Sequence, residues 1–453
     1  MKRKPLAFRI LPVMDADVVV IGAGAAGLAA ARILASRSLR AIVLEARDRI
    51  GGRVWSRQVA QITMPAELGA EFIHGEAPHT MALLRDAGMT AVATGGESWM
   101  CGEDGGLRRD DREFILASHA LDGARSLAKD ESADQFLRRL ERDEATRHMA
   151  EAARAFVEGF EAADPAIASV KSIADELRSG VDSTSSRPLG GYGPMFEHLY
   201  ASCTAAGVQI CLSTIVRRIS WRAGAVAVKV SNPSGELRTI HARAAVVTLP
   251  VGVLRQSGNE TEVAFDPDLP SAKRKALRNI EMGHAVKVVL WFRTAFWERI
   301  HSGRYRDSTF LRCPGQAFTA YWTQLPVRSE LIVAWAGGPN AIALSDAPQA
   351  EVIERALNGV GALLDEPTLV SKEFEGSAMH DWSRDQFAGG AYSYVVVGGG
   401  NARATLAEPV DNTLFFAGEA TSGDGQGGTV NGALETGERA AAEVATSLGT
   451  TAG

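Results

Sequence analysis

The chain has 453 residues, of which 46% are hydrophobic, and this is enough to bury a large core in more than one domain. Its 48 basic and 54 acidic residues give a formal net charge of -6 and are spread along the chain. The sequence therefore lacks the basic footprint that nucleic-acid binding requires. No apolar run approaches the roughly 18 residues of a membrane helix, so we expect no membrane anchor.

The four cysteines, Cys101, Cys203, Cys211 and Cys313, lie far apart or without the spacing of metal ligands. The sequence therefore predicts neither a disulfide framework nor a metal site, and it fits a reducing compartment. The basic stretch before Asp15 contains prolines and too short an apolar run for a signal peptide. We accordingly expect a cytoplasmic protein.

The first ordered elements are predicted between residues 17 and 45. Asp17–Ile21 is a continuous apolar run that reads as a strand, Ala25–Ala35 is rich in helix-forming residues, and Arg40–Leu44 is a second apolar run. Strand, tight turn, helix and strand in this order make a βαβ unit.

Gly22, Gly24 and Gly27 lie at the turn between the first strand and the helix. Glycines at this spacing permit a tight turn, let the backbone approach a pyrophosphate and allow close packing of helix on strand. The phosphates would lie at the helix N-terminus. Glu45, at the end of the second strand, is placed to accept hydrogen bonds from ribose hydroxyls. The alternative is a glycine turn without a ligand, but strand, helix and acid are all in place.

The rest of the chain divides by composition into helical and strand-rich stretches. Residues 78–200 predict a helical block, within which Ser183–Gly193 reads as a loop. Short β-branched runs in Gln209–Leu249 predict a β-meander that returns to the first sheet. Further strands are predicted at His284–Phe292, Leu331–Trp335 and Thr413–Ala417.

Five longer motifs resemble one enzyme family along almost the whole chain. They are EARDRIGGRVWS from residue 45, GAEFIHG from residue 69, TLPVGVL from residue 248, FFAGEATS from residue 415 and GGTVNGALETGERAA from residue 427. Together they resemble the flavin-containing amine oxidases, a family of monoamine and polyamine oxidases to which the flavin-type lysine demethylases are related.

This resemblance implies an α/β fold with a discontinuous, Rossmann-like FAD-binding domain of the GR2 type and an inserted α+β substrate domain. The FAD-binding domain would comprise residues 15–75, 205–255 and 400–447, and the substrate domain residues 76–204 and 256–399. The fingerprint and the resemblance assign FAD contacts to Gly22, Gly24, Ala25, Ala26, Gly27, Glu45, Ala46, Arg47, Gly52, Arg53, Gly69, Ala70, Glu71, Phe72, Val216, Thr248, Pro250, Trp382, Gly418, Glu419, Thr429 and Val430.

Lys287, Tyr392 and Trp382 are the candidate catalytic residues. Lys287 interrupts an apolar strand, where burial of its charge is costly without a partner. In the resembling family a lysine at this place holds a water against flavin N5; the alternative is a lysine that reaches solvent at a strand edge. Tyr392 and Trp382 resemble the aromatic residues on the substrate side of the flavin, where a chamber of this kind favours a neutral amine.

The sequence departs from the monoamine oxidases at two positions. Ala391 stands where those enzymes carry the cysteine that binds flavin covalently, so the resemblance predicts non-covalent FAD. Thr429 stands where they carry a second tyrosine. Glu71 and His74, with Tyr392 and Thr429, are candidates for the substrate side, although Glu71 and His74 could equally form only local hydrogen bonds.

The expected function is oxidation of a small amine or polyamine by hydride transfer to flavin N5, with imine hydrolysis and reduction of O2 to H2O2. The expected partners are the amine and O2, and an oligomer is left open. No protein general base is evident in the sequence. A flavin desaturase or protoporphyrinogen-type oxidase is the alternative enzyme, and a non-catalytic FAD-binding protein is the alternative of another class.

Overall fold

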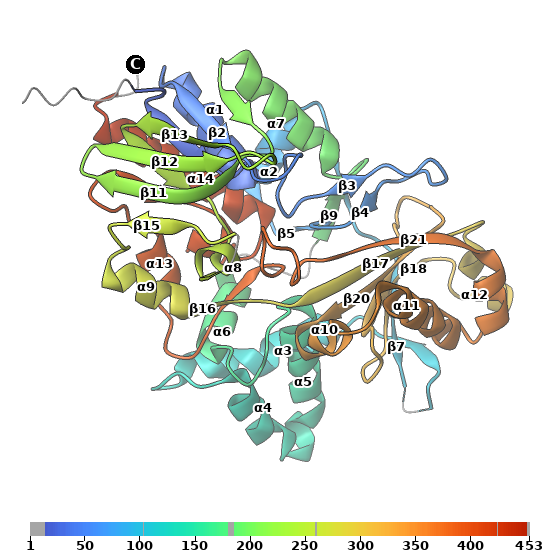
Figure 1. Cartoon of the computed structure of the whole chain (residues 1–453). Coiled ribbons are helices and arrows are strands. Elements are labelled where there is room, and N and C mark those ends of the chain that lie inside the picture. Colours follow the sequence, from blue (N-terminus) through green and yellow to red (C-terminus); the bar gives the residue numbers. More distant parts are fainter. Residues whose placement is uncertain (1–13, 103, 180–184, 259–260, 424, 451–453) are drawn as a thin grey trace, which may run out of the picture.

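A computed structural model describes residues 14–102, 104–179, 185–258, 261–423 and 425–450 (Figure 1). The N-terminal stretch that argued against a signal peptide, and residues 183 and 184 of the predicted loop, lie outside these ranges. None of the helices in these ranges combines the length and apolarity that crossing a membrane requires.

A parallel five-stranded sheet gathers strands from three distant stretches of the chain, in the order β10-β2-β1-β14-β23. Its strands are β1 (Val18–Ile21), β2 (Ala41–Leu44), β10 (Gln209–Cys211), β14 (Ala244–Val247) and β23 (Leu414–Phe416). The strands β1, β2 and β14 are buried at every position because both faces of the sheet are covered. The strand predictions for this sheet are confirmed.

The two faces of this sheet pack against different partners. Val18 and Val20 face α1 (Ala25–Ser36), α7 (Gly193–Ala205) and α14 (Val430–Ser447). Val19 and Ile21 face a second, four-stranded sheet, which continues the predicted meander. The strands of that sheet are β11 (Ile215–Arg222), β12 (Ala225–Ser231), β13 (Leu237–Ala242) and β15 (Ala264–Asp266). Alternate side chains of one strand thus enter two cores, as the pleat requires.

A seven-stranded sheet in the order β21-β17-β20-β19-β18-β7-β8 forms the other half of the molecule, at the right of Figure 1. Its strands are β7 (Glu97–Cys101), β8 (Leu107–Arg109), β17 (Ala285–Phe292), β18 (Ser308–Arg312), β19 (Ala320–Trp322), β20 (Leu331–Gly337) and β21 (Phe374–Asp381). Helices α10 (Gly338–Leu344) and α11 (Gln349–Leu364) contribute to the core on one face of it.

The predicted helical block is only partly correct. Its helices are α2 (Pro78–Asp86), α3 (Glu113–Asp122), α4 (Ala133–Glu141), α5 (Glu144–Ala155), a π-helical turn (Phe156–Phe160) and α6 (Val170–Ser179). Four strands interrupt the block, namely β6 (Ala91–Ala93), β7, β8 and β9 (Ser185–Pro188), and β9 replaces part of the predicted loop. These strands form because distant segments pair with them: β7 with β18, and β9 with β5 (Ile73–His74).

The smaller elements complete the connections between these layers. They are β3 (Ser56–Arg57), β4 (Ala66–Glu67), α8 (Val251–Leu254), α9 (Ser271–Arg278), β16 (Ile280–Met282), α12 (Pro367–Glu373), β22 (Ser393–Val395), α13 (Ala402–Ala407) and short 3-10 turns at Gly123–Ser126, Phe296–Glu298, Ile300–Gly303 and Glu419–Thr421.

The prediction that no cysteines pair is wrong. Cys101 and Cys313 form a disulfide with a Cα–Cα distance of 4.9 Å. They are 212 residues apart in sequence. They meet because β7 and β18 run parallel and pair Met100 with Arg312, and each of these residues directly precedes one of the two cysteines. Sequence spacing could not reveal this neighbourhood. Cys203 and Cys211 are free.

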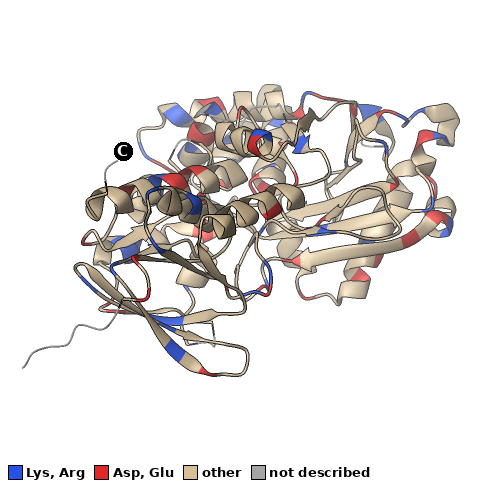
Figure 2. Cartoon of the chain, turned by 90° about the horizontal axis from the view of Figure 1, so that it is seen from above, with Lys and Arg blue, Asp and Glu red and all other residues tan. Residues whose placement is uncertain are grey.

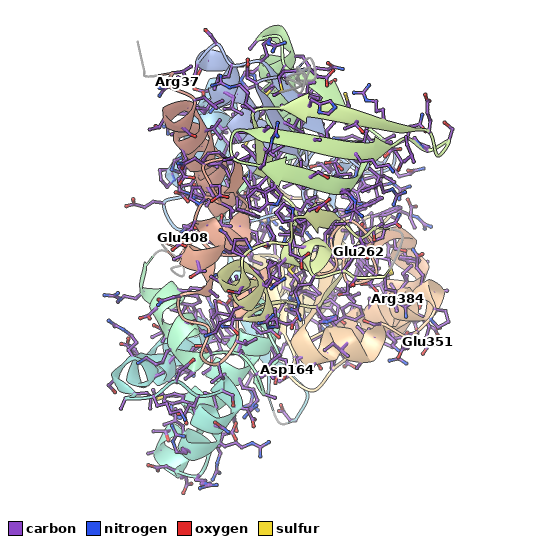
Figure 3. The ribbon with its side chains drawn as sticks, turned by 60° about the vertical axis from the view of Figure 1, so that its left-hand side comes forward. Arg37, Asp164, Glu262, Glu351, Arg384 and Glu408 are labelled. Carbon is purple, nitrogen blue, oxygen red and sulfur yellow. A yellow bond between two sulfur atoms is a disulfide. The ribbon has the colours of Figure 1, made fainter. Side chains whose placement is uncertain are left out.

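Acidic and basic residues are interspersed along both halves of the ribbon (Figure 2). Glu351, Arg384 and Glu408 are exposed and extend outward from the ribbon (Figure 3).

Candidate active site

A cavity of about 1160 Å³ extends from the five-stranded sheet, past the seven-stranded sheet, to the helical block. Its wall contains Gly22 and Glu45 at one end, Lys287 and Tyr392 from the second half of the chain, and Glu151 from α5. Every candidate site residue predicted from the sequence lines this cavity except Gly27. The fold thus brings the predicted residues together.

Gly27 acts by permitting a close contact beneath the turn that opens onto the cavity. A Cβ on Gly27 would lie 1.9 Å from the carbonyl oxygen of Gly22, whose φ of +106° also favours glycine. Helix α1 begins without a side-chain cap or an acidic residue in its first turn, and Ala25 and Ala26 line the cavity there. Its N-terminus is therefore suited to an anion such as a phosphate.

Glu45 is buried at the end of β2 and fixes the turns around it. One oxygen accepts a hydrogen bond from the Ala23 N–H at 2.7 Å and the other from the Arg47 N–H at 2.9 Å. Burial raises the pKa of Glu45, and the two backbone hydrogen bonds oppose this. Each carboxylate oxygen can accept a further hydrogen bond, so these contacts leave room for a ribose hydroxyl. The role of Glu45 as a ribose ligand stays a prediction.

Arg47 contacts an acid that sequence reasoning missed. Its guanidinium binds Asp385 in a bidentate pair at 2.8 and 2.7 Å, and His380 Nε2 lies 2.8 Å from the same carboxylate. Burial alone would raise the pKa of Asp385, but these hydrogen bonds outweigh it and hold the pKa well below its ordinary value. The pair joins the β2 edge to the loop that follows β21.

Arg53 and Glu419 form the centre of a second charged network. Arg53 Nη1 donates to Glu419 at 2.8 Å and to the Ala391 carbonyl at 2.9 Å. Glu419 also accepts from Ser393 Oγ at 2.6 Å and from the Gly428 N–H at 3.1 Å. The arginine is 22% exposed at the cavity wall, so it keeps a face for an anionic ligand.

Lys287 lies in an interior strand, so the alternative of a lysine at a strand edge is wrong. Strand β17 pairs with β20 on one side and β21 on the other, and Lys287 is 2% exposed. Its Nζ donates to Glu71 Oε2 at 2.6 Å and to the Gly69 carbonyl at 3.2 Å. The buried ammonium thus has the partner that its burial requires.

The Glu71 carboxylate is fully engaged by local hydrogen bonds. Besides Lys287, its Oε1 accepts from Arg187 Nε, Trp322 Nε1 and Gln324 Nε2, each at 3.0 Å. Burial raises the pKa of Glu71, but the charges of Lys287 and Arg187 outweigh it and lower the pKa to about 2. Of the two alternatives for Glu71, local hydrogen bonding is the one observed, and contacts to cofactor or substrate stay predictions.

The aromatic candidates are held by hydrogen bonds at their polar ends. Trp382 Nε1 donates to the Leu68 carbonyl at 2.8 Å, and the Tyr392 hydroxyl donates to the Phe160 carbonyl. Both rings line the cavity. His74 lines it as well, with its ring 5.0 Å from that of Phe160.

Thr429 is the N-cap of α14. Its Oγ1 accepts from the Gly432 N–H at 2.9 Å and donates to the Gln426 carbonyl at 2.8 Å. The hydroxyl is thus engaged in the cap, although Thr429 and Val430, at the N-terminus of the helix, line the cavity. A direct contact to cofactor or substrate stays a prediction.

Sequence reasoning also did not single out Arg187, Glu161, Glu176 and Arg403, which are charged residues at or near the cavity. Arg403 is 7% exposed, donates to Ser393 Oγ at 2.7 Å and pairs with Glu176 at 3.2 Å. Arg187 and Arg403 stand in ordinary polar surroundings in the sequence, so no local signal marks them. Among the described residues, no group of three or more histidine, cysteine or acidic side chains could hold a metal ion.

A sequence profile of the family described as flavin containing amine oxidoreductase matches residues 25–105 and 105–445. The chain belongs to this family. It is 31% identical to polyamine oxidase 2 of Arabidopsis thaliana, over 94% of this chain and 87% of that protein. It is 29% identical to lysine-specific histone demethylase 1 homolog 3 of Arabidopsis thaliana, over 95% of this chain but only 30% of that longer protein.

Two solved structures share the fold of this family member. Cyclohexylamine oxidase from Brevibacterium oxydans IH-35A matches with a TM-score of 0.80 at 21% identity, covering 96% of this chain and all of that one. Wild-type putrescine oxidase bound to putrescine matches with a TM-score of 0.77 at 20% identity and the same coverage. The description of the family names flavin-containing oxidoreductases of amines.

Proposed function

We propose that this protein binds FAD non-covalently and oxidises a small amine or polyamine, with O2 as the final electron acceptor. The observation that carries the proposal is the buried ammonium of Lys287 on the wall of a cavity that the glycine turn and the aromatic residues Trp382 and Tyr392 also line. The names of similar proteins, which include polyamine and putrescine oxidases, support the substrate class.

The cavity suits an extended dinucleotide. The N-terminus of α1 and the guanidinium of Arg53 would hold the phosphates, and Glu45 would accept hydrogen bonds from the ribose. We propose residues 15–75, 205–255 and 400–447 as the FAD-binding domain. When bound, FAD supplies the hydride acceptor and passes the electrons on to O2.

The chain's own groups orient and desolvate the amine. Trp382 and Tyr392 offer aromatic faces that attract a cation and form a largely apolar wall that favours its neutral form. Lys287 provides one fixed positive charge, which Glu71 and the Gly69 carbonyl hold in place. A preorganised cation in a site of low dielectric stabilises negative charge that develops beside it.

The residues near the predicted attachment point support non-covalent binding. Ala391 has no nucleophilic side chain, and its carbonyl accepts a hydrogen bond from Arg53. Cys101 and Cys313 are joined to each other, and Cys203 is buried against α1 with its Sγ 3.4 Å from the Leu28 carbonyl. Acid precipitation should therefore leave the yellow colour in the supernatant, and colour in the washed pellet would contradict this.

The decisive experiment is anaerobic mixing of the yellow protein with cyclohexylamine, putrescine, spermidine and a methylated lysine peptide. Bleaching of the flavin by an amine, followed by H2O2 formation on admission of air, is the expected result. If no amine bleaches the flavin, the protein is not an amine oxidase. Bleaching by a compound with a saturated carbon-carbon bond and no amine would favour the desaturase alternative.

A further inference from the structure

One wall of the cavity is an unusual helical turn that the fold holds firmly in place. The π-helical residues Phe156–Phe160 continue α5, and such turns are frequent at functional sites. The Gly159 carbonyl accepts a hydrogen bond from Trp335 Nε1 at 2.7 Å, and the Phe160 carbonyl accepts one from Tyr392. Gly337 lets the turn approach β20, because a Cβ there would lie 2.4 Å from the Glu158 carbonyl oxygen.

Glu161 directly follows this turn and lines the cavity together with Tyr392. In the described part of the chain, its carboxylate has no hydrogen-bond or ion-pair partner, unlike those of Glu45, Glu71 and Glu419. The charged groups that act on it are Glu176 on α6 and Arg403 on α13. Burial and the charge of Glu176 raise the pKa of Glu161 to about 8, while Arg403 opposes them.

Amine oxidation requires that the substrate ammonium lose a proton before hydride transfer. An aliphatic amine has a pKa of roughly 10 and enters as an ammonium, whereas hydride leaves only from the neutral amine. Lys287 and Glu71 are bound to each other, and the Tyr392 hydroxyl already donates to a carbonyl. Burial, followed by the charge of Glu161, raises the pKa of Tyr392.

We propose that Glu161 is a catalytic residue that accepts the proton of the substrate ammonium, an inference that rests on the proposed amine oxidation. The carboxylate takes one proton from R-CH2-NH3+, leaving R-CH2-NH2 and a neutral carboxylic acid. After the oxidised product leaves, the acid returns this proton to solvent. Glu176 is a positioning residue that acts through its negative charge on Glu161.

The role proposed for Glu161 predicts that flavin bleaching becomes faster as pH rises. The acceptor form of Glu161 is the carboxylate, so flavin bleaching at saturating amine rises with pH through about 8. In Glu161→Gln the acceptor is absent, so bleaching falls by roughly 100-fold or more at the plateau and loses this rise. In Glu176→Gln the rise moves to lower pH, because a like charge is removed.

The experiment compares the wild type with Glu161→Gln, Glu176→Gln and Glu158→Gln, after equal FAD content and thermal unfolding are established. The amine is whichever of the four compounds named above bleaches the wild-type flavin fastest. Glu158 also lies on the π-helical turn and lines the cavity, so Glu158→Gln is the matched control and should keep the rise near pH 8. If Glu161→Gln does not fold, the shift in Glu176→Gln decides, and an unshifted profile overturns the proposal.

A second measurement does not depend on turnover. Calorimetry of the same amine binding to photoreduced enzyme, in two buffers of different ionisation enthalpy, gives the number of protons released. Above pH 8 the wild type should release no net proton, because Glu161 retains the proton that the ammonium loses, whereas Glu161→Gln, which lacks this acceptor, should release one proton to the buffer when it binds the neutral amine. Equal proton release by both proteins above pH 8, or a pH profile of bleaching in Glu161→Gln that matches the wild type, overturns the role of Glu161 but leaves amine oxidation intact. Failure of all four compounds to bleach the wild-type flavin removes the proposed function together with this inference.

Discussion

The two ends of the cavity are built in different ways. At the glycine turn, the contacts are mainly backbone to backbone and come from neighbouring stretches of sequence, as between Gly27 and Gly22. Around Lys287, the contacts are between charged side chains from distant stretches of sequence. Glu71 is 216 residues from Lys287 and 116 residues from Arg187. The end at the glycine turn therefore depends on close approach of backbone segments, and the end at Lys287 depends on a balance of buried charges.

The most complete loss of cofactor binding is expected from a methyl group at the glycine turn. In Gly27→Ala the Cβ would lie 1.9 Å from the Gly22 carbonyl oxygen, so strand and helix must separate. We expect loss of FAD retention and destabilisation by about 3 kcal/mol. FAD content after gel filtration and urea unfolding would measure both. Gly95→Ala is the control, since no atom lies within 4 Å of its added Cβ, and equal behaviour of the two variants would contradict the role of the turn.

Removing the negative charge at the other end tests the balance of charge. Glu71→Gln leaves the ammonium of Lys287 and the guanidinium of Arg187 buried without a counterion, which should cost about 3–5 kcal/mol of unfolding free energy. The wild-type contribution is present above the ordinary carboxyl pKa near 4.5 and is lost as pH falls toward 2. Urea unfolding between pH 3 and pH 7 measures it. An additive double variant with Lys287→Met would show that the two residues are not coupled.

Lys287→Met separates stability from chemistry at this end. Methionine retains the length of the side chain and removes the ammonium, while Glu71 keeps Arg187, Trp322 and Gln324 as donors. We expect folding and FAD binding, with turnover reduced tenfold to a thousandfold and reoxidation affected at least as strongly as reduction. Stopped-flow measurement of both half-reactions tests this. Wild-type rates in both would make Lys287 a structural residue.

The same contrast explains what the sequence could predict. The strand, turn and helix around Gly22 follow from local apolar runs and glycine spacing, and they were predicted almost to the residue. The partners of Glu71 and the Cys101–Cys313 disulfide depend on which strands pair, and β7 looked like part of a helical block. The sequence predicted that Lys287 needs a partner, but only the fold identifies Glu71 as that partner.

Glu67 offers the smallest and most selective test, because its charge, unlike that of Glu71, lacks a compensating partner. It lies 7% exposed in β4; Oε1 accepts from Ser56 Oγ and the Tyr192 N–H, while the buried Oε2 has no hydrogen-bond partner among the described residues. Burial raises the pKa of Glu67 to about 7, against smaller effects of Ser56 and Lys287.

A folded-state pKa above the ordinary value means that Glu67 favours folding in its protonated form. Its contribution is therefore intact below pH 4.5 and is lost as pH rises through 7, at a cost of up to about 3 kcal/mol. Glu67→Gln keeps the acceptor for Ser56 and Tyr192 and removes the titration. We expect a variant as stable as the wild type at pH 5 and more stable at pH 8, measured by urea unfolding at both values. Equal stability of the two proteins at pH 8 would mean that the buried carboxylate finds compensation for its charge, as Glu71 does.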